Sequence, residues 1–399
     1  FSNSLSTVNC LRNGYSMKVL ITGGAGFIGK WLVEKFPIDC EIVIIDSLDE
    51  QVHKTSPDFA PELKARAKCI KADVQCIEEQ IEAIEGTDVV IHLAAQTGTG
   101  QSMYEISKYV QQNANGTAKL LELISKLQHQ PRRIILASSR AVYGDGAYTD
   151  GAKIYYPKGR SLSNLQQGIW DIYGEDGEKL TAMPMNEHHS TKPTSVYGLT
   201  KLWQEQLIQN FCQSQNIDLA ILRFQNVYGP KQELGNPYTG IIGIFTNAIS
   251  QDSALELFED GLVTRDFVFV GDVADAVIKC AIDHRSIDAT IDIGSGQAVT
   301  LIEVVETIAQ LLDKKADFSI SGRFRVGDIR HAVADMSRYE TIFGKWQPTS
   351  LKDGLAQYLE WYLQQEPLNP STLQASLTEM EQKGLLLTKH PSVLNLGNK

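Results

Sequence analysis

The stretch that decides the fold is residues 18–29, which read KVLITGGAGFIG. Its apolar first half predicts a strand buried on both faces, and the apolar residues that recur every four positions from Ile28 predict a helix directly after the glycines. Gly23 and Gly26 allow the backbone to turn and to approach a pyrophosphate, and Gly29 allows the helix to pack closely on the strand. The pattern therefore predicts a dinucleotide site, with the phosphates at the N-terminus of this helix.

A second apolar run, residues 41–45, ends in Asp46, which lies 23 residues after Gly23. A carboxylate at this distance accepts hydrogen bonds from the 2′-hydroxyl of the adenosine ribose and repels a 2′-phosphate. The alternative is an ordinary turn residue at the end of a strand. The spacing favours the first interpretation and predicts NAD rather than NADP as the cofactor.

The composition excludes several classes of partner. A length of 399 residues with 43% hydrophobic and 21% charged residues predicts a soluble globular protein with a large core. The net charge of −11 disfavours nucleic acid and membrane surfaces, and no apolar run reaches the roughly 18 residues of a membrane helix. The cysteines lie far apart without a C-x-x-C pair, which predicts reduced thiols in a cytoplasmic protein and no metal site.

Strand and helix patterns alternate along the chain, which predicts an α/β fold with a Rossmann-type doubly wound parallel sheet and a smaller α/β domain for the substrate. Further strands are predicted at 88–93, 133–138, 219–224, 266–270 and 290–293, and helices at 117–127, 199–211, 300–312 and 351–363. The expected division is a lead or tag at 1–16, a start at Met17, an NAD-binding domain at 17–230, a substrate domain at 231–366 and a C-terminal extension at 367–399 with a helix at 371–383. Residues 145–192 are predicted to form a long polar insert near the site, with one helix at 162–169.

Tyr197 and Lys201 are four residues apart in a predicted helix, so they share one face. A nearby ammonium favours the phenolate, which would make Tyr197 a base. Tyr104 and Lys108 have the same spacing, but only Tyr197 follows a strand that ends in a serine, Ser139. That hydroxyl is expected at the carboxyl edge of the sheet, where open α/β folds bind ligands.

Together these motifs resemble the extended short-chain dehydrogenase/reductase family, in particular its nucleotide-sugar epimerases and dehydratases, over roughly residues 17–365. The resemblance rests on the residues 22–29, Asp46, 73–74, 92–95, Asn113, 138–139, 142–144, 197–201 and 226–230. It implies NAD as cofactor, a nucleotide-diphosphate sugar as substrate and a homodimer that uses the helices around 102–127 and 199–211.

The resemblance also implies roles for individual residues. Ser139 orients the sugar hydroxyl, Tyr197 exchanges its proton, and Lys201 lowers the pKa of the tyrosine and binds the nicotinamide ribose. Asn113 braces the active-site helix. The implied cofactor-binding residues are Gly23, Gly26, Phe27, Ile28, Gly29, Asp46, Ser47, Leu48, Asp73, Val74, Leu93, Ala94, Ala95, Gln96, Asn113, Tyr197, Lys201 and Phe224. The implied substrate-binding residues are Ser139, Arg140, Asn226, Arg265 and Arg330.

The two residues after Ser139 discriminate between reactions of the family. Dehydratases carry an Asp–Glu acid/base pair there, and glucuronate decarboxylases keep the Glu, whereas this chain has Arg140 and Ala141. Arginine does not give up its proton in a protein and alanine has none. The reductive 3,5-epimerases need a cysteine near the sugar, and none lies between Cys76 and Cys212. The remaining reaction is 4-epimerisation by transient oxidation at C4.

Segments 46–53, 97–104, 138–144 and 325–331 are similar to those of the dTDP-L-rhamnose 4-epimerases, which make dTDP-6-deoxy-L-talose for surface polysaccharides. The insert lacks the cysteines often found in that group. The open alternatives are a UDP-hexose 4-epimerase of glucose or glucuronate type, an NAD-dependent sugar dehydrogenase, and a non-catalytic NAD-binding scaffold.

Overall fold

A computed structural model describes residues 11–12, 15–53, 58–234, 240–366 and 377–389. Its centre is a parallel sheet of seven strands in the order β16-β11-β7-β6-β3-β4-β5. In chain order the strands are β3 (Lys18–Thr22), β4 (Glu41–Asp46), β5 (Lys68–Lys71), β6 (Val89–His92), β7 (Arg133–Ser139), β11 (Asp218–Phe224) and β16 (Ala289–Ile293). The strand order reverses between β3 and β6, which is the switch point where such sheets bind ligands. The predicted fold class is confirmed.

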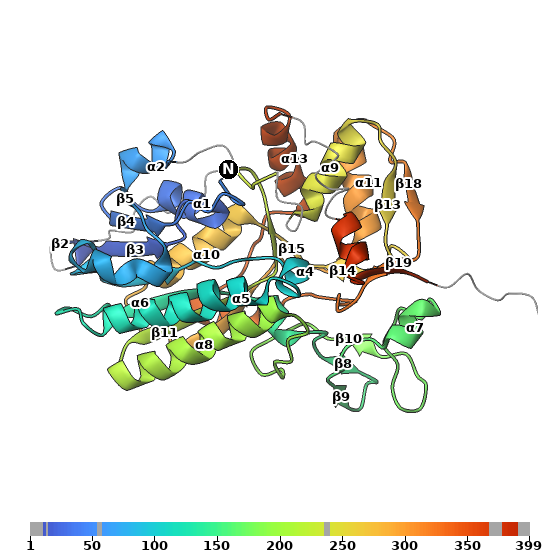
Figure 1. The fold of residues 1–399 in the computed structure, drawn as a ribbon, viewed down its shortest axis with the longest axis horizontal. Coiled ribbons are helices and arrows are strands. Elements are labelled where there is room, and N and C mark those ends of the chain that lie inside the picture. The colour runs from blue at the N-terminus through green and yellow to red at the C-terminus, as the bar shows by residue number, and fades with distance from the viewer. Residues whose placement is uncertain (1–10, 13–14, 54–57, 235–239, 367–376, 390–399) are drawn as a thin grey trace, which may run out of the picture.

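Helices cover both faces of this sheet because almost every side chain of its central strands is buried. On one face α1 (Phe27–Lys35), α2 (Pro61–Arg66), α10 (Val270–Ile282) and α12 (Ser337–Phe343) enclose an aliphatic core. On the other face α3 (Ile81–Ile84), α6 (Gly116–Ile124) and α8 (Val196–Gln215) enclose a second core (Figure 1). The predicted helices at 117–127 and 199–211 are confirmed as α6 and α8, with shifted ends.

A third core joins further helices and short strands between residues 226 and 362. These elements are α9 (Ile241–Ser250), α11 (Leu301–Leu311), α13 (Leu351–Tyr362), β12 (Asn226–Tyr228), β13 (Leu255–Leu257), β14 (Thr264–Arg265), β15 (Phe267–Phe269), β17 (Val299–Thr300) and β18 (Phe318–Ile320). The predicted helices 300–312 and 351–363 are confirmed as α11 and α13. α11 begins at a capping box, in which Thr300 accepts from the amide of Glu303 and the Glu303 side chain accepts from Thr300.

One predicted element belongs to a different part of the fold. The strand at 290–293 was assigned to the substrate domain, but β16 pairs in parallel with β11 at the edge of the large sheet. The helix α10 that precedes it packs against α1. The physical reason is that β11 is buried from Leu219 to Phe224, so it is not a suitable exposed edge. The chain therefore returns to the NAD-binding sheet after residue 231.

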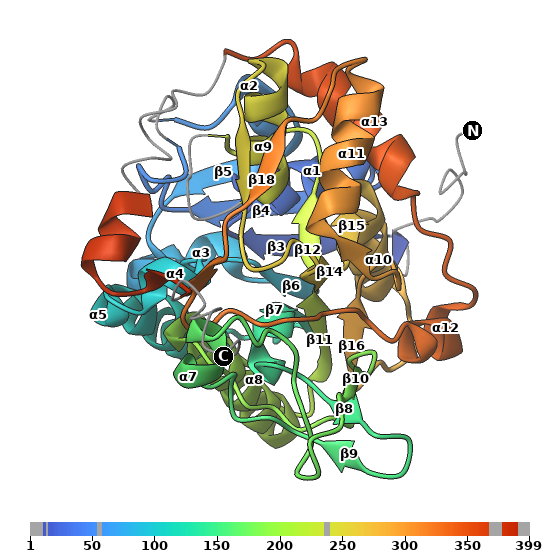
Figure 2. The same cartoon turned by 90° about the vertical axis from the view of Figure 1, so that its right-hand side faces the viewer.

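The insert is more ordered than its polar sequence predicts. It contains a three-stranded sheet of β8 (Tyr148–Thr149), β9 (Ile154–Tyr155) and β10 (Thr181–Ala182), together with α7 (Leu162–Gln166), which confirms the single predicted helix (Figure 2). Strands of two residues are too short to show an alternating pattern.

Both ends of the chain carry further structure. Residues 377–382 are helical, whereas 371–376 of the predicted helix lie outside the described residues. β20 (Leu386–Thr388) then pairs with β19 (Arg323–Arg325). In the expected lead, Leu11–Arg12 and Tyr15–Ser16 form a short antiparallel pair, and residues 1–10 and 13–14 lie outside the described residues.

Candidate active site

The glycine loop between β3 and α1 lies tightly against the segment that follows β6. Gly23 has a φ of +70°, and a Cβ atom there would be 2.7 Å from the amide nitrogen of Ala94. A Cβ atom on Gly29 would be 2.4 Å from the carbonyl oxygen of Gly24. Only glycine tolerates both contacts. Gly26 directly precedes α1, and the first helical residues are Phe27 and Ile28, so free amides surround a cradle that fits the pyrophosphate of NAD.

Asp46 ends β4 beside this loop. Its carboxylate accepts from the amides of Ala25 (2.9 Å) and Leu48 (2.9 Å), and Leu48 has a left-handed φ of 55°. The exposed Ser47 lies between Asp46 and Leu48 in the sequence. The structure therefore places Asp46 where the sequence predicts a ribose-binding group, with both oxygens already held by the backbone.

Asp73 and Val74, which are predicted to bind the cofactor, also have partners within the protein. The Asp73 carboxylate accepts from the amide of Gln75 (2.8 Å) at the start of a 3₁₀ helix and from the Gln112 side chain (2.9 Å). Val74 is buried in the core beside Gly116. The other predicted residues of the cofactor site, Leu93, Ala94, Ala95 and Gln96, follow β6, and Phe224 ends β11 opposite Ser139.

Asn113 connects the cofactor site to the helix that carries the tyrosine. Its side chain accepts from the Gln96 amide (2.7 Å) and donates to the Gln96 carbonyl (3.1 Å) and to the Thr200 hydroxyl (2.9 Å). Thr200 directly precedes Lys201 on α8. These hydrogen bonds fit the predicted role of Asn113 in bracing this helix.

The structure brings Ser139, Tyr197 and Lys201 together at the carboxyl end of β7. α8 begins where Ser195 accepts from the amide of Gly198 (3.1 Å), which places Tyr197 in the first turn. The Lys201 ammonium donates to the carbonyl of Ala137 on β7 (2.8 Å). Ser139 ends the same strand and is a hydrogen-bonding neighbour of the Tyr197 phenol.

The alternative pair is not arranged in this way. Tyr104 precedes the helix α5 (Ile106–Tyr109) rather than sharing it with Lys108. The Lys108 ammonium contacts Gln51 (3.1 Å) and Glu105 (3.5 Å). The ammonium of Lys383 lies over the Tyr104 ring, 5.4 Å from its centre. The preference for Tyr197 therefore agrees with the structure.

The groups that alter the pKa of Tyr197 differ from those that the sequence predicts. Burial raises the pKa of Tyr197, and the neighbours that lower it again are Ser139 and Arg140 rather than Lys201. Burial also lowers the pKa of Lys201 to about 7, which Glu205 opposes. The helical spacing predicts this role for Lys201, but in the structure its ammonium donates to the Ala137 carbonyl of β7. Arg140 is the cation whose charge acts on the phenol.

A buried network below this group was missed. Arg223 on β11 donates to both oxygens of Glu205 (2.9 and 2.7 Å) and to the Tyr143 hydroxyl (2.7 Å). Tyr143 donates to Asp292 (2.7 Å), and Ser138 donates to Glu205. Glu205 lies four residues after Lys201, so the helical spacing could have identified it. The network connects α8, β7, β11 and β16 beneath the site.

Arg140 and Asn226 meet above the strand ends, where Arg140 Nε donates to Asn226 Oδ1 (3.3 Å). Arg265 lies nearby, and it donates to Asp328 (2.8 Å) and to the carbonyls of Ile329 (2.9 Å) and Thr264 (2.9 Å). The charges of Arg265 and Asp328 both act on Arg140. These residues form one polar wall of the site.

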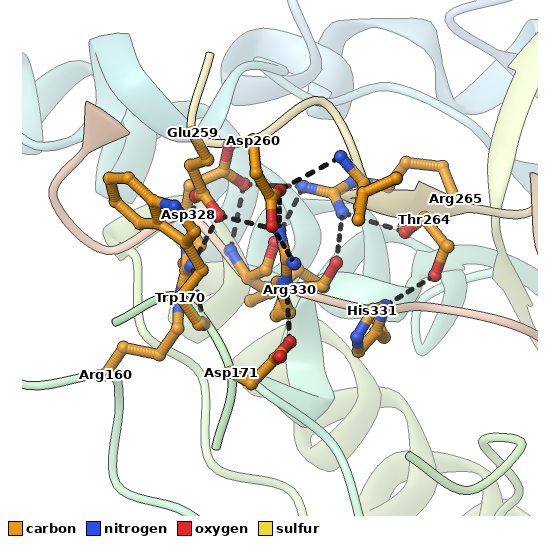
Figure 3. A network of polar contacts seen from close by, with 12 residues as sticks. Arg160, Trp170, Asp171, Glu259, Asp260, Thr264, Arg265, Asp328, Arg330 and His331 are labelled. Atoms are coloured by element: carbon orange, nitrogen blue, oxygen red, sulfur yellow. Dashed lines mark hydrogen bonds and ion pairs between the residues drawn. The ribbon is translucent and has the colours of Figure 1, made fainter. Parts of the chain in front are cut away.

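Arg330 does not fit the predicted contact with a diphosphate. Its side chain is 2% exposed and donates to Asp171 (3.1 Å), Glu259 (3.2 Å) and both oxygens of Asp260 (2.7 and 2.7 Å), as Figure 3 shows. These carboxylates accept hydrogen bonds from all three nitrogen atoms of the Arg330 guanidinium. The prediction for Arg330 is therefore corrected: it fastens the insert to the substrate domain.

Arg325 is the cation that the sequence analysis missed. It lies on β19 three residues before Asp328, and the charges of Asp328 and Arg265 act on it. Burial lowers its pKa, and its Nε has no hydrogen-bond partner among the described residues. Its guanidinium lies over the ring of Phe258 at 5.3 Å. A buried cation with a free donor suits an anionic ligand better than Arg330 does.

The C-terminal segment 377–389 closes one side of this region (Figure 2). The buried Met380 lies beside Gly100 of α4 (Thr99–Ser102), which also carries Ser102, the acceptor of the Tyr197 amide (3.0 Å). Leu387 packs on the cluster of Leu165, Trp170 and Phe324. The segment therefore contacts the cofactor side, the insert and the substrate domain.

Comparisons with known proteins agree with this geometry. The model of the NAD dependent epimerase/dehydratase family matches residues 19–160 and 170–294. A dTDP-L-rhamnose 4-epimerase of Burkholderia thailandensis is 38% identical over 355 residues, which is 87% of this chain and 95% of that protein.

Solved structures of nucleotide-sugar enzymes superpose on most of the chain. A UDP-N-acetylglucosamine 4-epimerase of Methanobrevibacter ruminantium in complex with UDP-N-acetylmuramic acid has a TM-score of 0.70 at 25% identity, covering 88% of this chain and 100% of that one. MoeE5 in complex with UDP-glucuronic acid and NAD has a TM-score of 0.68 at 27% identity, covering 87% and 99%.

The fold and the site define a Rossmann-type enzyme of the extended short-chain dehydrogenase/reductase class that uses NAD. The chain belongs to the NAD dependent epimerase/dehydratase family, and it is an isomerase of the nucleotide-sugar epimerase type.

No three His, Cys, Asp or Glu side chains in the described ranges gather as metal ligands. No helix in that part of the chain is long and apolar enough to cross a membrane.

Proposed function

We propose that this protein is a dTDP-L-rhamnose 4-epimerase, which interconverts dTDP-L-rhamnose and dTDP-6-deoxy-L-talose. The observation that carries the proposal is the environment of Tyr197. The neighbours that act on its phenol are a hydroxyl, Ser139, and a cation, Arg140. A tyrosine in this environment moves a proton but has no carboxylic acid beside it to help eliminate water.

NAD fits the cradle of Gly23, Gly26 and Gly29, and when bound it accepts a hydride from C4 of the sugar and returns it to the opposite face. Ser139 orients the C4 hydroxyl, and Tyr197 removes its proton during oxidation and returns one during reduction. Lys201 holds the nicotinamide ribose, and Asp46 holds the adenosine ribose. Arg140 stabilises the phenolate, because a cation beside it favours the charged form.

Arg325, Arg265 and Asn226 are assigned to the nucleotide diphosphate. The overall charge of the chain is −11, so local cations must hold this anion. Arg325 has a free donor, whereas Arg265 is kept in place by Asp328.

The experiment is an NMR panel of dTDP-, UDP- and GDP-sugars that detects inversion at C4. Turnover of dTDP-L-rhamnose without net absorbance at 340 nm supports the proposal. Stoichiometric NADH formation would indicate a dehydrogenase, and turnover of UDP-sugars alone would indicate the alternative suggested by the UDP complexes of the structural neighbours. Tyr197→Phe should lose activity, whereas the matched control Tyr104→Phe should retain it.

We also propose a cytoplasmic homodimer. Large apolar side chains are partly exposed on neighbouring elements, namely Met103 (40%), Ile106 (52%), Trp203 (37%) and Leu207 (39%). Trp203 and Leu207 are four residues apart on α8, and α4 and α5 pack beside that helix. An apolar surface of this kind supports association with a second copy.

A further inference from the structure

Two buried polar groups of the insert lack hydrogen-bond partners among the described residues. Both carboxylate oxygens of Asp145 and the hydroxyl of Tyr148 have none, although the two residues are only 3% and 1% exposed. The Gly159 amide approaches the Asp145 carboxylate without hydrogen-bond geometry. These atoms are also buried from bulk solvent. Such groups destabilise a free protein and are uncommon unless they have a function.

The Asp145 carboxylate lies beside the polar wall of the active site: a Cβ atom on Gly159 would be 4.0 Å from it, the next residue, Arg160, donates to the Asp328 carbonyl (2.8 Å), and Asp328 accepts from Arg265 (2.8 Å). The charges that act on Asp145 are those of Arg160, Asp328 and Arg265. Asp145, Arg160 and Arg265 act in turn on Tyr148. Arg265 and Asp328 are also the groups that act on Arg140, the neighbour of Tyr197. The unpartnered atoms therefore belong to the same cluster as the proposed catalytic residues.

The surrounding cations do not supply the missing donors. Arg160 donates to both oxygens of Glu259 (2.7 and 2.7 Å) and to the Asp328 carbonyl (2.8 Å), as Figure 3 shows in part. Arg265 is held by Asp328, and Arg330 by Asp260. Burial raises the pKa of Asp145 to about 6, so the carboxylate is largely charged at neutral pH. A charged, unpartnered acceptor is left beside cations whose Nη donors are used elsewhere, and the buried Nε of Arg160 has no partner among the described residues either.

We propose that Asp145 and Tyr148 form a hydroxyl-binding subsite of the substrate site, contributed by the insert. The inference rests on the proposed function and extends it. The carboxylate accepts hydrogen bonds from hydroxyl groups of the ligand, and Tyr148 donates or accepts one more. The ligand displaces the side chains that now cover these atoms. The negative charge of Asp145 disfavours a carboxylate on the ligand, so the subsite selects neutral sugars over uronates.

The hydroxyl groups have two possible sources, the pentose of the nucleotide and the hexose. Isothermal titration of the holoenzyme with free dTDP and with dTDP-L-rhamnose separates them. If Asp145→Asn weakens binding of both ligands, the subsite holds the pentose. If it weakens binding of the nucleotide sugar alone, the subsite holds the hexose.

The test compares Asp145→Asn and Tyr148→Phe with the matched controls Asp150→Asn and Tyr155→Phe, which change an exposed pair in the same insert. Each subsite variant should raise KM or Kd about tenfold. Its Tm without nucleotide sugar should be unchanged or higher, because Tyr148→Phe removes an unsatisfied hydroxyl and Asp145→Asn removes a buried charge that no hydrogen bond compensates. The controls should leave KM unchanged. Asp145→Asn should also narrow the difference in affinity between UDP-glucose and UDP-glucuronate.

A lower Tm with KM and Kd within twofold of wild type would show that both residues are only structural and would overturn the subsite. The panel on the wild-type protein tests the proposed function separately. If another nucleotide sugar is the substrate, the same titrations are made with that sugar, so failure of the subsite and failure of the substrate assignment give different results.

Discussion

The guanidinium of Arg140 donates to the side-chain oxygen of Asn226 (3.3 Å), and its charge and the Tyr197 phenol each alter the pKa of the other. Arg140 opposes the burial that raises the pKa of Tyr197, and the phenol in turn favours the charged guanidinium. In the dehydratases an acid stands at the position of Arg140. In this chain the arginine at that position acts on Tyr197, the proposed catalytic base.

Arg140→Met should therefore move the acidic limb of kcat/KM to higher pH. The base works as a phenolate, so the rate rises as the pH passes its pKa, and loss of a cation raises that pKa. The pH profile of each variant measures the change. Arg140→Lys keeps the charge and should shift the limb less. Identical profiles for the wild type and both variants would contradict the role assigned to Arg140.

Gly29→Ala should destabilise the protein and reduce its NAD content. The new methyl group would meet the Gly24 carbonyl oxygen at 2.4 Å, and backbone atoms on both sides cannot move aside easily. Overpacking of this kind costs about 1–3 kcal/mol. Urea unfolding and the absorbance of released cofactor measure the two effects. Gly100→Ala is the control, because its nearest neighbour would be a flexible side chain at 3.7 Å.

Acid should weaken the fold through His92. Its ring contacts Thr22 (2.7 Å), Thr117 (2.9 Å) and Gln204 (3.1 Å), and burial lowers its pKa from 6.5 to about 3. Between these pH values the unfolded chain binds a proton that the folded chain does not. The free energy of unfolding should therefore fall as the pH decreases from about 6.5 towards 3.

Urea unfolding at a series of pH values tests this expectation. His92→Gln should have a shallower pH dependence than wild type over that range, although it is less stable at neutral pH. His188→Gln, at an exposed position, should keep the wild-type dependence. If His92→Gln lowers the free energy of unfolding by the same amount at every pH, the pH dependence does not come from His92.

The proposed dimer depends on the apolar residues of α8. The double variant Trp203→Glu with Leu207→Glu places charges in the surface and should yield a monomer by light scattering. Ile38→Glu, at a position that is 86% exposed and far from α8 in the sequence, should keep the wild-type mass. A wild-type protein that is monomeric at micromolar concentration would rule out this interface.

Local patterns determined the nucleotide-binding half of this protein. The glycine spacing, the apolar strands and the helical position of Tyr197 depend on neighbouring residues in the sequence, so they predicted the sheet, NAD and the group of Ser139, Tyr197 and Lys201. The tertiary structure alone decided which charges are free. Arg330 and Arg325 look equivalent in sequence, but the carboxylates that surround Arg330 come from residues 70 or more positions away.

The edge strand β16, the insert sheet and the C-terminal strand β20 were also decided by tertiary contacts. The strand at 290–293 is predicted from its sequence, but its pairing with β11 joins segments that lie far apart in the chain. The strands of the insert and β20 have two or three residues, too few for periodicity. Asp145 shows the same limit: the sequence places it in a polar loop, and only the packing around it shows a buried carboxylate without a partner. Local sequence encodes backbone conformation and burial pattern, whereas the pairing of charges depends on contacts that form only when the chain is folded.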